Sequence, residues 1–162
     1  MIEGRVWRYG DDVNTDVIFP GKYTYQPLTP EEMATHALED LDPSFAKEVK
    51  EGDVIVAGAN FGCGSSREQA ATCLVAAGVA AVIAKSFSRI FFRNAINNGL
   101  PVIELKEGID GIKKGNIIKI DFERGIVLHE GSEYHFPALP AEVLAILEDG
   151  GLIPHVRKEL EK

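Results

Sequence analysis

Apolar and polar residues are distributed along the chain in two patterns, which predict two kinds of strand. Residues 2–8 alternate between apolar and polar around Val6 and Trp7, as expected for a half-buried strand. Three later runs are mostly apolar and are bounded by turn formers, as in buried strands: 53–57, 79–84 and 101–105.

Helices are predicted between these apolar runs. A glycine-rich turn over 58–64 leads into a helix over 65–77 that Gly78 ends. Ser86 is placed to cap a second helix that continues to Asn98. Two successive strand–helix units indicate a parallel sheet.

The pattern changes after residue 115. Short alternating runs at 117–122, 126–130 and 134–136 are joined by glycine-containing turns, which predicts antiparallel hairpins. A last helix is predicted over 141–147, and the charged tail from Arg157 should be solvated. The whole chain, residues 1–162, is therefore expected to be one α/β domain with a parallel βαβ core and C-terminal antiparallel hairpins.

The segment between the first strand and the first predicted helix is rich in turn formers. Residues 10–28 include Pro20 and Pro27 and are expected to form a loop, longer than most connections and therefore a candidate functional segment. Thr29 begins a capping box, from which a helix should continue to about Leu41. A second short turn is expected at residues 42–43.

Composition argues against several classes of protein. The net charge of −8 would repel nucleic acid. No apolar run approaches the roughly 20 residues of a membrane span, and the first residues do not resemble a signal peptide, so a cytoplasmic location is expected. Cys63 and Cys73 are the only cysteines, too few for a disulfide framework or for an iron–sulfur cluster of this chain's own.

The segment 58–68 is the strongest local signal for function. Its glycines allow backbone N–H groups to converge at a helix start, where unpaired donors favour an anion, and Arg67 adds a fork that matches a carboxylate. Neither a phosphate-binding lysine nor the spacing of a nucleophile elbow is present. The alternative is structural: Ser65 caps the helix and the glycines only make a tight turn.

Three motifs at matching intervals resemble the small subunits of 3-isopropylmalate dehydratase and homoaconitase, in the aconitase superfamily: Asn14–Pro20, Phe61–Glu68 and Arg89–Pro101. The resemblance covers nearly the whole chain. It implies a swivelling β/β/α three-layer domain that is inactive alone. It also implies a large partner subunit, in a heterodimer or heterotetramer, that carries a [4Fe-4S] cluster through cysteines of its own. The reaction implied is the dehydration and rehydration that interconvert 2-isopropylmalate and 3-isopropylmalate in leucine biosynthesis.

The same resemblance assigns roles to individual residues. Ser65 would be the base that exchanges the substrate's α-proton, and Ser66 and Arg67 would bind a substrate carboxylate. Gly64 lies where backbone donors to the serine anion are needed. Asp16 resembles a family residue that orients the acid–base network, although it could equally be a turn residue bonded to its own backbone.

In this family the loop after the Pro-Gly element selects the substituent on the malate skeleton. Here that loop contains Lys22, Tyr23, Thr24 and Tyr25. No arginine lies between residues 20 and 31 to pair with a third carboxylate, which favours isopropyl or methyl substituents. Homoaconitase and 2,3-dimethylmalate dehydratase stay open as alternatives, the first because Lys22 carries a positive charge.

Two readings from other classes compete with a split enzyme. One is a non-catalytic module that binds carboxylates through the turn at 64–67. The other is a hydrolase centred on Cys63, but no histidine is tied to this cysteine by a known signature, so we interpret Cys63 as a packing residue. The chain is expected to supply no metal ligand.

Overall fold

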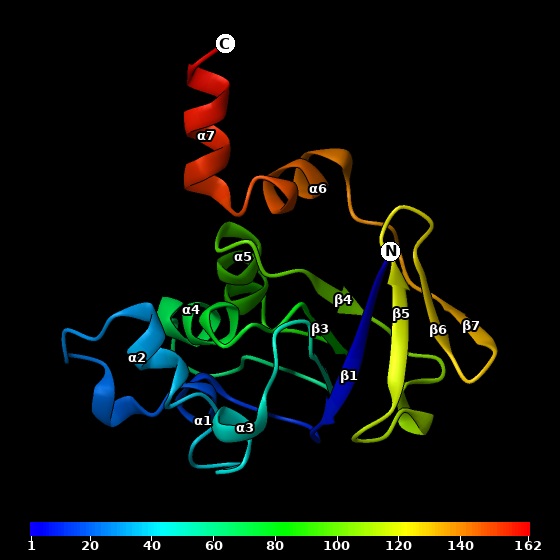
Figure 1. Cartoon of the computed structure of the whole chain (residues 1–162), viewed down its shortest axis with the longest axis horizontal. Helices are drawn as coiled ribbons and strands as arrows, with labels where there is room; N and C mark the ends of the chain where they lie inside the picture. Colours follow the sequence, from blue (N-terminus) through cyan, green and yellow to red (C-terminus); the bar gives the residue numbers. More distant parts are fainter.

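The computed structural model describes residues 1–162 and is built around one mixed sheet with β1 (Ile2–Arg8) at its centre. The strand order is β4-β3-β2-β1-β5-β6-β7 (Figure 1). On one side of β1 all pairings are parallel, and on the other all are antiparallel. The remaining strands are β2 (Val54–Ala57), β3 (Ala81–Ala84), β4 (Val102–Glu104), β5 (Ile117–Asp121), β6 (Ile126–His129) and β7 (Ser132–His135).

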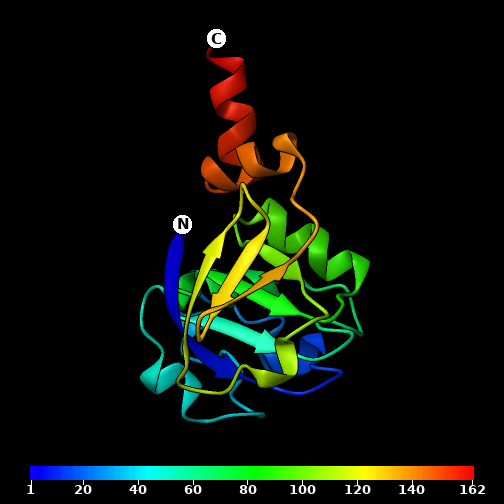
Figure 2. The ribbon, with the colours of Figure 1, turned by 90° about the vertical axis from the view of Figure 1, so that its right-hand side faces the viewer.

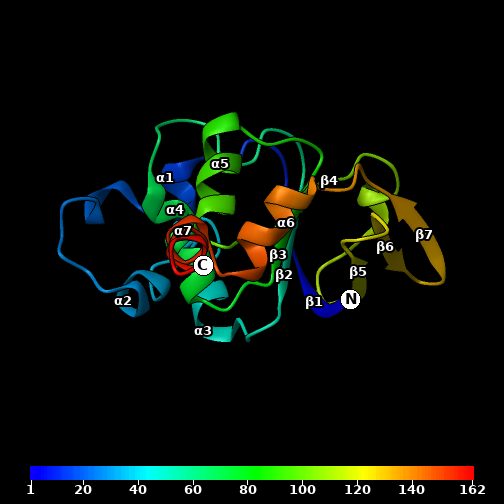
Figure 3. The ribbon, with the colours of Figure 1, turned by 90° about the horizontal axis from the view of Figure 1, so that it is seen from above.

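The sheet curls so that its parallel part is covered on both faces. Because successive side chains of a strand point to opposite faces, Ile55 enters one hydrophobic cluster, with the helices, whereas Val54 and Val56 enter another. The second cluster includes Ile118 and Val127 of the antiparallel strands. Figures 2 and 3 show β5–β7 on one side of the parallel strands and the helices on the other. The predicted three-layer β/β/α arrangement with C-terminal hairpins is confirmed.

Seven α-helices are present, most of them short. Two longer ones, α4 (Glu68–Ala76) and α5 (Arg89–Asn97), connect the parallel strands as predicted. The others are α1 (Thr15–Ile18), α2 (Pro30–Ala34), α3 (Phe45–Glu48), α6 (Ala141–Glu148) and α7 (Leu152–Leu160). None combines the length and the apolar character needed to cross a bilayer.

Both long helices start later than predicted. The first begins at Glu68, because Arg67 is still extended with φ of −137°, so Ser65 lies in the turn and does not cap the helix. Ser88, not Ser86, caps α5 by accepting a hydrogen bond from the backbone N–H of Phe91. The hydroxyl of Ser86 instead accepts from the backbone N–H of Asn60, at 2.8 Å.

The predicted long loop has more structure than expected, and the helix after it has less. Residues 10–28 contain α1 and a 3-10 turn over Gly21–Tyr23. The capping box at Thr29 is present, but α2 ends at Ala34. Leu38 adopts a positive φ of 56° and donates its backbone N–H to the carbonyl of Ile18, at 2.8 Å. This tertiary contact turns the chain away from the helix axis.

The C-terminal prediction missed a helix. Residues 141–148 form α6 as expected, but α7 follows after a break at Gly151, which is buried and has φ of 133°. A Cβ at Gly151 would lie 2.5 Å from the carbonyl oxygen of Asn97, so glycine is required there. Figures 1 and 2 show α7 projecting from the body of the molecule, and its residues from Arg157 on are exposed.

Candidate functional site

The glycine turn of residues 58–67 follows β2 and leads into α4, at the carboxyl end of the parallel strands. The segment before α1 lies against it. Gly62 donates its backbone N–H to the carbonyl of Val13 at 2.7 Å, and Thr15 donates to the carbonyl of Cys63 at 2.9 Å. Two motifs about 50 residues apart are thereby joined through their backbones.

Glycine is required in this turn for two reasons. Gly62 has φ of 81°, and a Cβ there would lie 2.2 Å from the ring carbon Cγ of Phe91. Gly64 also has a positive φ, 94°, which a residue with a side chain adopts only with strain. The close approach of Phe91 to Gly62 places the start of α5 directly against the turn.

Gly64, Ser65 and Ser66 are three successive exposed residues of the turn. The backbone of Ser65 is fixed by a buried side chain, because the hydroxyl of Thr15 donates to the Ser65 carbonyl at 2.8 Å. Thr15 is 3% exposed and is one of few buried polar residues. The residue type and its neighbours do not distinguish Thr15 in the sequence, where its place in the Asn14–Pro20 motif is the available signal.

Arg67 and Asp16 are brought together. The guanidinium Nη1 pairs with Oδ1 of Asp16, and Nη2 donates to the carbonyl of Phe19 at 2.6 Å. The guanidinium also lies over the Phe19 ring, 5.8 Å from its centroid, while Nε is buried without a partner. Arg67 has a 10% exposed side chain and Asp16 a 63% exposed one, so the pair has its arginine inside and its carboxylate at the surface.

Asp16 does not bond to its own backbone, as the alternative interpretation of a turn residue required. Asn14 accepts from the backbone N–H of Val17, at 2.8 Å, and so caps α1. The carboxylate of Asp16 reaches across to Arg67 instead. Gly21 borders this pair, since a Cβ there would lie at ordinary contact distance, 3.4 Å from Asp16 Oδ1 and 3.5 Å from Arg67 Nη1.

The predicted selectivity loop, residues 22–25, is tied to the helix that follows the turn but makes no hydrogen bond to the serines. Lys22 and Tyr23 approach Glu39, with Lys22 Nζ 3.9 Å from its carboxylate. The Thr24 carbonyl accepts from Gln69 Nε2 at 3.3 Å, which ties the loop to α4. Tyr25 is 98% exposed.

Neither cysteine has the environment of a nucleophile. Burial, together with the charge of Asp12, raises the pKa of Cys63, so its thiol is protonated at neutral pH. Burial also raises the pKa of Cys73, which is fully buried and donates to the Ala70 carbonyl at 3.3 Å. These environments argue against a hydrolase centred on Cys63.

No three histidine, cysteine or carboxylate side chains meet in a group that could hold a metal ion. Cys63 and Cys73 are both free thiols, one of them inaccessible. The donors present therefore do not fit an iron–sulfur cluster held by this chain alone.

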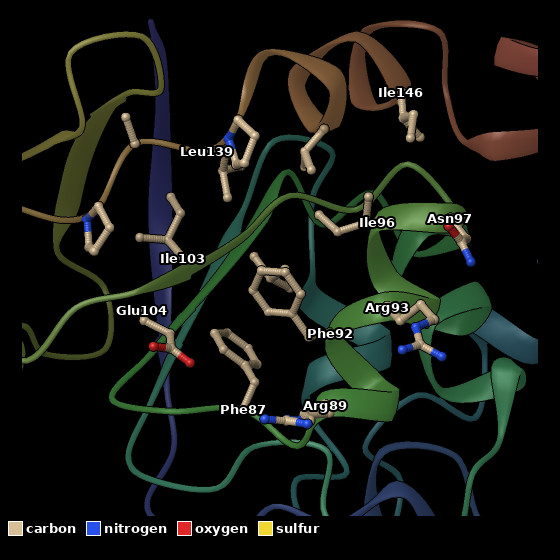
Figure 4. Close-up of a pocket in the computed structure, with 15 residues that line it drawn as sticks. Phe87, Arg89, Phe92, Arg93, Ile96, Asn97, Ile103, Glu104, Leu139 and Ile146 are labelled. Carbon is tan, nitrogen blue, oxygen red and sulfur yellow. The ribbon is translucent and has the colours of Figure 1, made fainter.

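The largest cavity lies away from the serine turn. It has a volume of about 770 Å³ and is an open groove between α5, β4, α6 and the segment that precedes α6. Its lining is mainly apolar, with Phe87, Phe92 and Ile146 among the residues that Figure 4 labels. None of the predicted site residues lines it.

Comparison with known proteins agrees with the geometry. The family described as aconitase C-terminal domain matches residues 12–108. The 3-isopropylmalate dehydratase small subunit of Heliobacterium modesticaldum is 51% identical over 95% of this chain and 93% of its own length. The methanogen homoaconitase small subunit of Methanothermobacter thermautotrophicus is 51% identical over 99% of this chain and 94% of its own length.

A solved structure has the same fold. The 3-isopropylmalate dehydratase chain of Methanocaldococcus jannaschii superposes with a TM-score of 0.92 at 45% sequence identity. The match covers 98% of this chain and 95% of that one.

Proposed function

Because this chain belongs to the aconitase C-terminal domain family, among the small subunits of 3-isopropylmalate dehydratase and homoaconitase, we propose that it is the small subunit of a cytoplasmic hydro-lyase. The reaction is the interconversion of 2-isopropylmalate and 3-isopropylmalate by dehydration and rehydration, a step of leucine biosynthesis. The observation that carries this proposal is the exposed serine turn backed by the Arg67–Asp16 pair.

Ser65 acts as the base that takes the substrate's α-proton. A serine hydroxyl is a very weak acid, so its anion needs fixed donors and a nearby cation. Backbone N–H groups of the turn from Gly64 onward and the guanidinium of Arg67 are candidates for this stabilisation. Thr15 supports the arrangement by holding the carbonyl of Ser65, whose side chain is exposed.

Ser66 and Arg67 bind a carboxylate of the substrate, and Asp16 orients Arg67. The guanidinium already holds one carboxylate in the free chain, that of Asp16. The contact to the Phe19 carbonyl limits the rotation of the arginine, so its direction is set before the substrate arrives. Arginine suits this role because its planar fork matches a carboxylate.

The active site is completed by a large subunit, in a heterodimer or heterotetramer. That subunit would hold the [4Fe-4S] cluster, which would supply a Lewis acid for the departing hydroxyl. The exposed serines and the lack of a metal-binding group in this chain both support a site that is incomplete without the partner. Residues 1–162 would act as one domain that docks as a unit.

The substituent of the substrate is read by the loop of residues 22–25. The loop offers tyrosines and one lysine but no arginine, which favours an isopropyl group over a third carboxylate. Homoaconitase is the second candidate, because a relative of that name is 51% identical to this chain. A 2,3-dimethylmalate dehydratase is the remaining alternative.

The test is hydration of 2-isopropylmaleate under anaerobic conditions, by this chain alone and then mixed with its cluster-loaded large partner. The loss of the enoate's ultraviolet absorbance is followed. We expect activity only in the mixture. A stable complex that is inactive would reject isopropylmalate and direct the assay to homoaconitate and dimethylmaleate, and failure to form a complex would reject the subunit assignment.

A further inference from the structure

One cluster of polar side chains lies outside the chemistry proposed above. In this Glu39 cluster (Tyr23, His36 and Glu39, with Lys22 at its edge) the rings of Tyr23 and His36 stack with centroids 3.8 Å apart. The Tyr23 hydroxyl donates to Glu39 Oε2 at 3.0 Å, and His36 Nδ1 lies 3.2 Å from Glu39 Oε1. A single carboxylate therefore holds both rings.

The chain after α2 presents this carboxylate to the loop. His36 and Glu39 are three residues apart in a hydrogen-bonded turn, in which Glu39 donates its backbone N–H to the His36 carbonyl at 3.1 Å, and their side chains meet. Between them Leu38 is fully buried, and its backbone N–H is bonded to the Ile18 carbonyl. The turn is thus fixed to the core, and the cluster has a rigid base.

The protonation states suit a permanent clamp. Burial acts to raise the pKa of Glu39, but hydrogen bonds from His36 and Tyr23 outweigh it, so this pKa is lowered and the carboxylate is ionised at neutral pH. Burial and the hydrogen bond to Glu39 raise the pKa of Tyr23, so its phenol keeps the proton that it donates. Both partners are in the state that the hydrogen bond requires.

A second contact holds the loop at Thr24, the residue after Tyr23. Gln69 of α4 donates to the Thr24 carbonyl at 3.3 Å. The next residue, Tyr25, is 98% exposed and is the part of the loop left free to contact a substituent. Gln69 lies two residues after Arg67, so this anchor also sets the loop's position relative to the serine turn.

We propose that His36 and Glu39 are positioning residues for substrate selectivity, and that they act by clamping Tyr23 and with it the loop of residues 22–25. Tyr23 is then an anchor of the loop and not a contact of the substrate. The inference rests on the proposed function, because the clamped loop is the one that reads the substituent.

The first test uses the isolated chain and does not depend on activity. Limited trypsin digestion is followed by mass spectrometry, with the rate of cleavage after Lys22 as the readout and cleavage after Lys106 as the internal reference. Glu39→Gln keeps the size of the side chain and removes its charge, so we expect cleavage after Lys22 to be about tenfold faster. The matched control is Asp40→Asn, an exposed neighbour, which should leave both rates unchanged.

The second test uses the assembled enzyme. Glu39→Gln should raise KM for 3-isopropylmalate about tenfold and lower the preference over a methyl-substituted malate, with kcat within about twofold. Tyr23→Phe, which keeps the ring and loses the hydroxyl, should act in the same direction by about threefold.

The outcomes separate the clamp from the enzyme. Unchanged cleavage after Lys22 in Glu39→Gln would overturn the clamp, and faster cleavage with unchanged KM and preference would overturn its role in selectivity. A fall in kcat alone would assign Glu39 to another role. If the wild-type complex has no hydro-lyase activity, the proposed function fails, while the digestion still decides whether the clamp exists.

Discussion

The parallel and antiparallel parts of the sheet share β1 but differ in how their strands are buried. Every residue of β2 and β3 is buried. In β5 exposed and buried residues alternate, and β7 has no buried residue at all. The parallel strands are covered by helices on one face and by the antiparallel strands on the other, so the glycine turn extends from the most constrained part of the molecule.

This difference suggests that the two parts of the sheet have different roles. The parallel part positions the serine turn, where small displacements would be costly for chemistry. The antiparallel part closes the second hydrophobic cluster, and its outer face carries none of the residues in the proposed mechanism. Matched substitutions in the two parts should therefore have unequal effects.

The largest difference is expected between two exposed serines, Ser65 in the parallel part and Ser132 at the start of β7. Ser65→Ala should lower kcat of the assembled enzyme about 10³-fold or more, because the base is lost. Ser132→Ala should leave kcat unchanged. Both variants should unfold in urea within about 0.5 kcal/mol of the wild type, since both side chains are exposed. Full activity of Ser65→Ala would remove the serine from the mechanism.

Two glycines with nearly equal φ provide the next comparison. Gly62→Ala would place a Cβ 2.2 Å from Phe91, whereas Gly131→Ala in the β6–β7 turn meets nothing within 4 Å. Gly62→Ala should lower the free energy of unfolding by about 3 kcal/mol or more, through overpacking and backbone strain. Gly131→Ala should cost about 1 kcal/mol, from backbone strain alone. Urea unfolding measures both, and equal losses would contradict the contrast between the two parts.

Two arginines test the carboxylate site. Arg67→Lys removes the fork that holds Asp16 and the Phe19 carbonyl, so KM of the assembled enzyme should rise about 10- to 100-fold. Arg124→Lys, in the exposed turn between β5 and β6, should leave KM unchanged. An unchanged KM in Arg67→Lys would mean that the guanidinium has only a structural role.

The smallest effect concerns Asp53, the residue just before β2. Burial acts to raise its pKa, but hydrogen bonds from Trp7, the Lys50 backbone and Arg5 outweigh it, and the pKa lies below the usual 3.8. A lowered pKa means that Asp53 contributes stability above the unfolded-state value and loses it as pH falls through the folded-state value. As the pH is lowered from about 5 to about 3, the urea concentration at the unfolding midpoint should therefore fall, and it should fall less steeply in Asp53→Asn than in the wild type. Parallel curves would show that Asp53 does not contribute.

The sequence predicted an element well where a local pattern, such as an apolar run or a capping box, determines it. The apolar runs of β2 and β3 and the capping box at Thr29 are as expected. Predictions failed where a distant contact decides the conformation. The helix after Thr29 ends early because Leu38 bonds to Ile18, and α7 begins where Gly151 packs against Asn97.

The candidate site divides in the same way. The serine turn and Arg67 are recognisable from residue types and spacing, because an anion site needs glycines, donors and a cation close together in the chain. Thr15 under Ser65 and Glu39 beside Tyr23 could not be paired from the sequence, since each is a contact between segments with no local pattern linking them.

The sequence by itself determined the α/β class, through hydrophobic periodicity, and the family, through three motifs, because both are properties of short segments; the layered arrangement followed from the family resemblance. Only the tertiary structure decided the state of Arg67, already engaged by Asp16, and the position of the selectivity loop, held by Glu39 and Gln69. The physical reason is that a hydrogen bond or ion pair between distant segments depends on where folding brings them, and one chain carries many side chains that could have formed it.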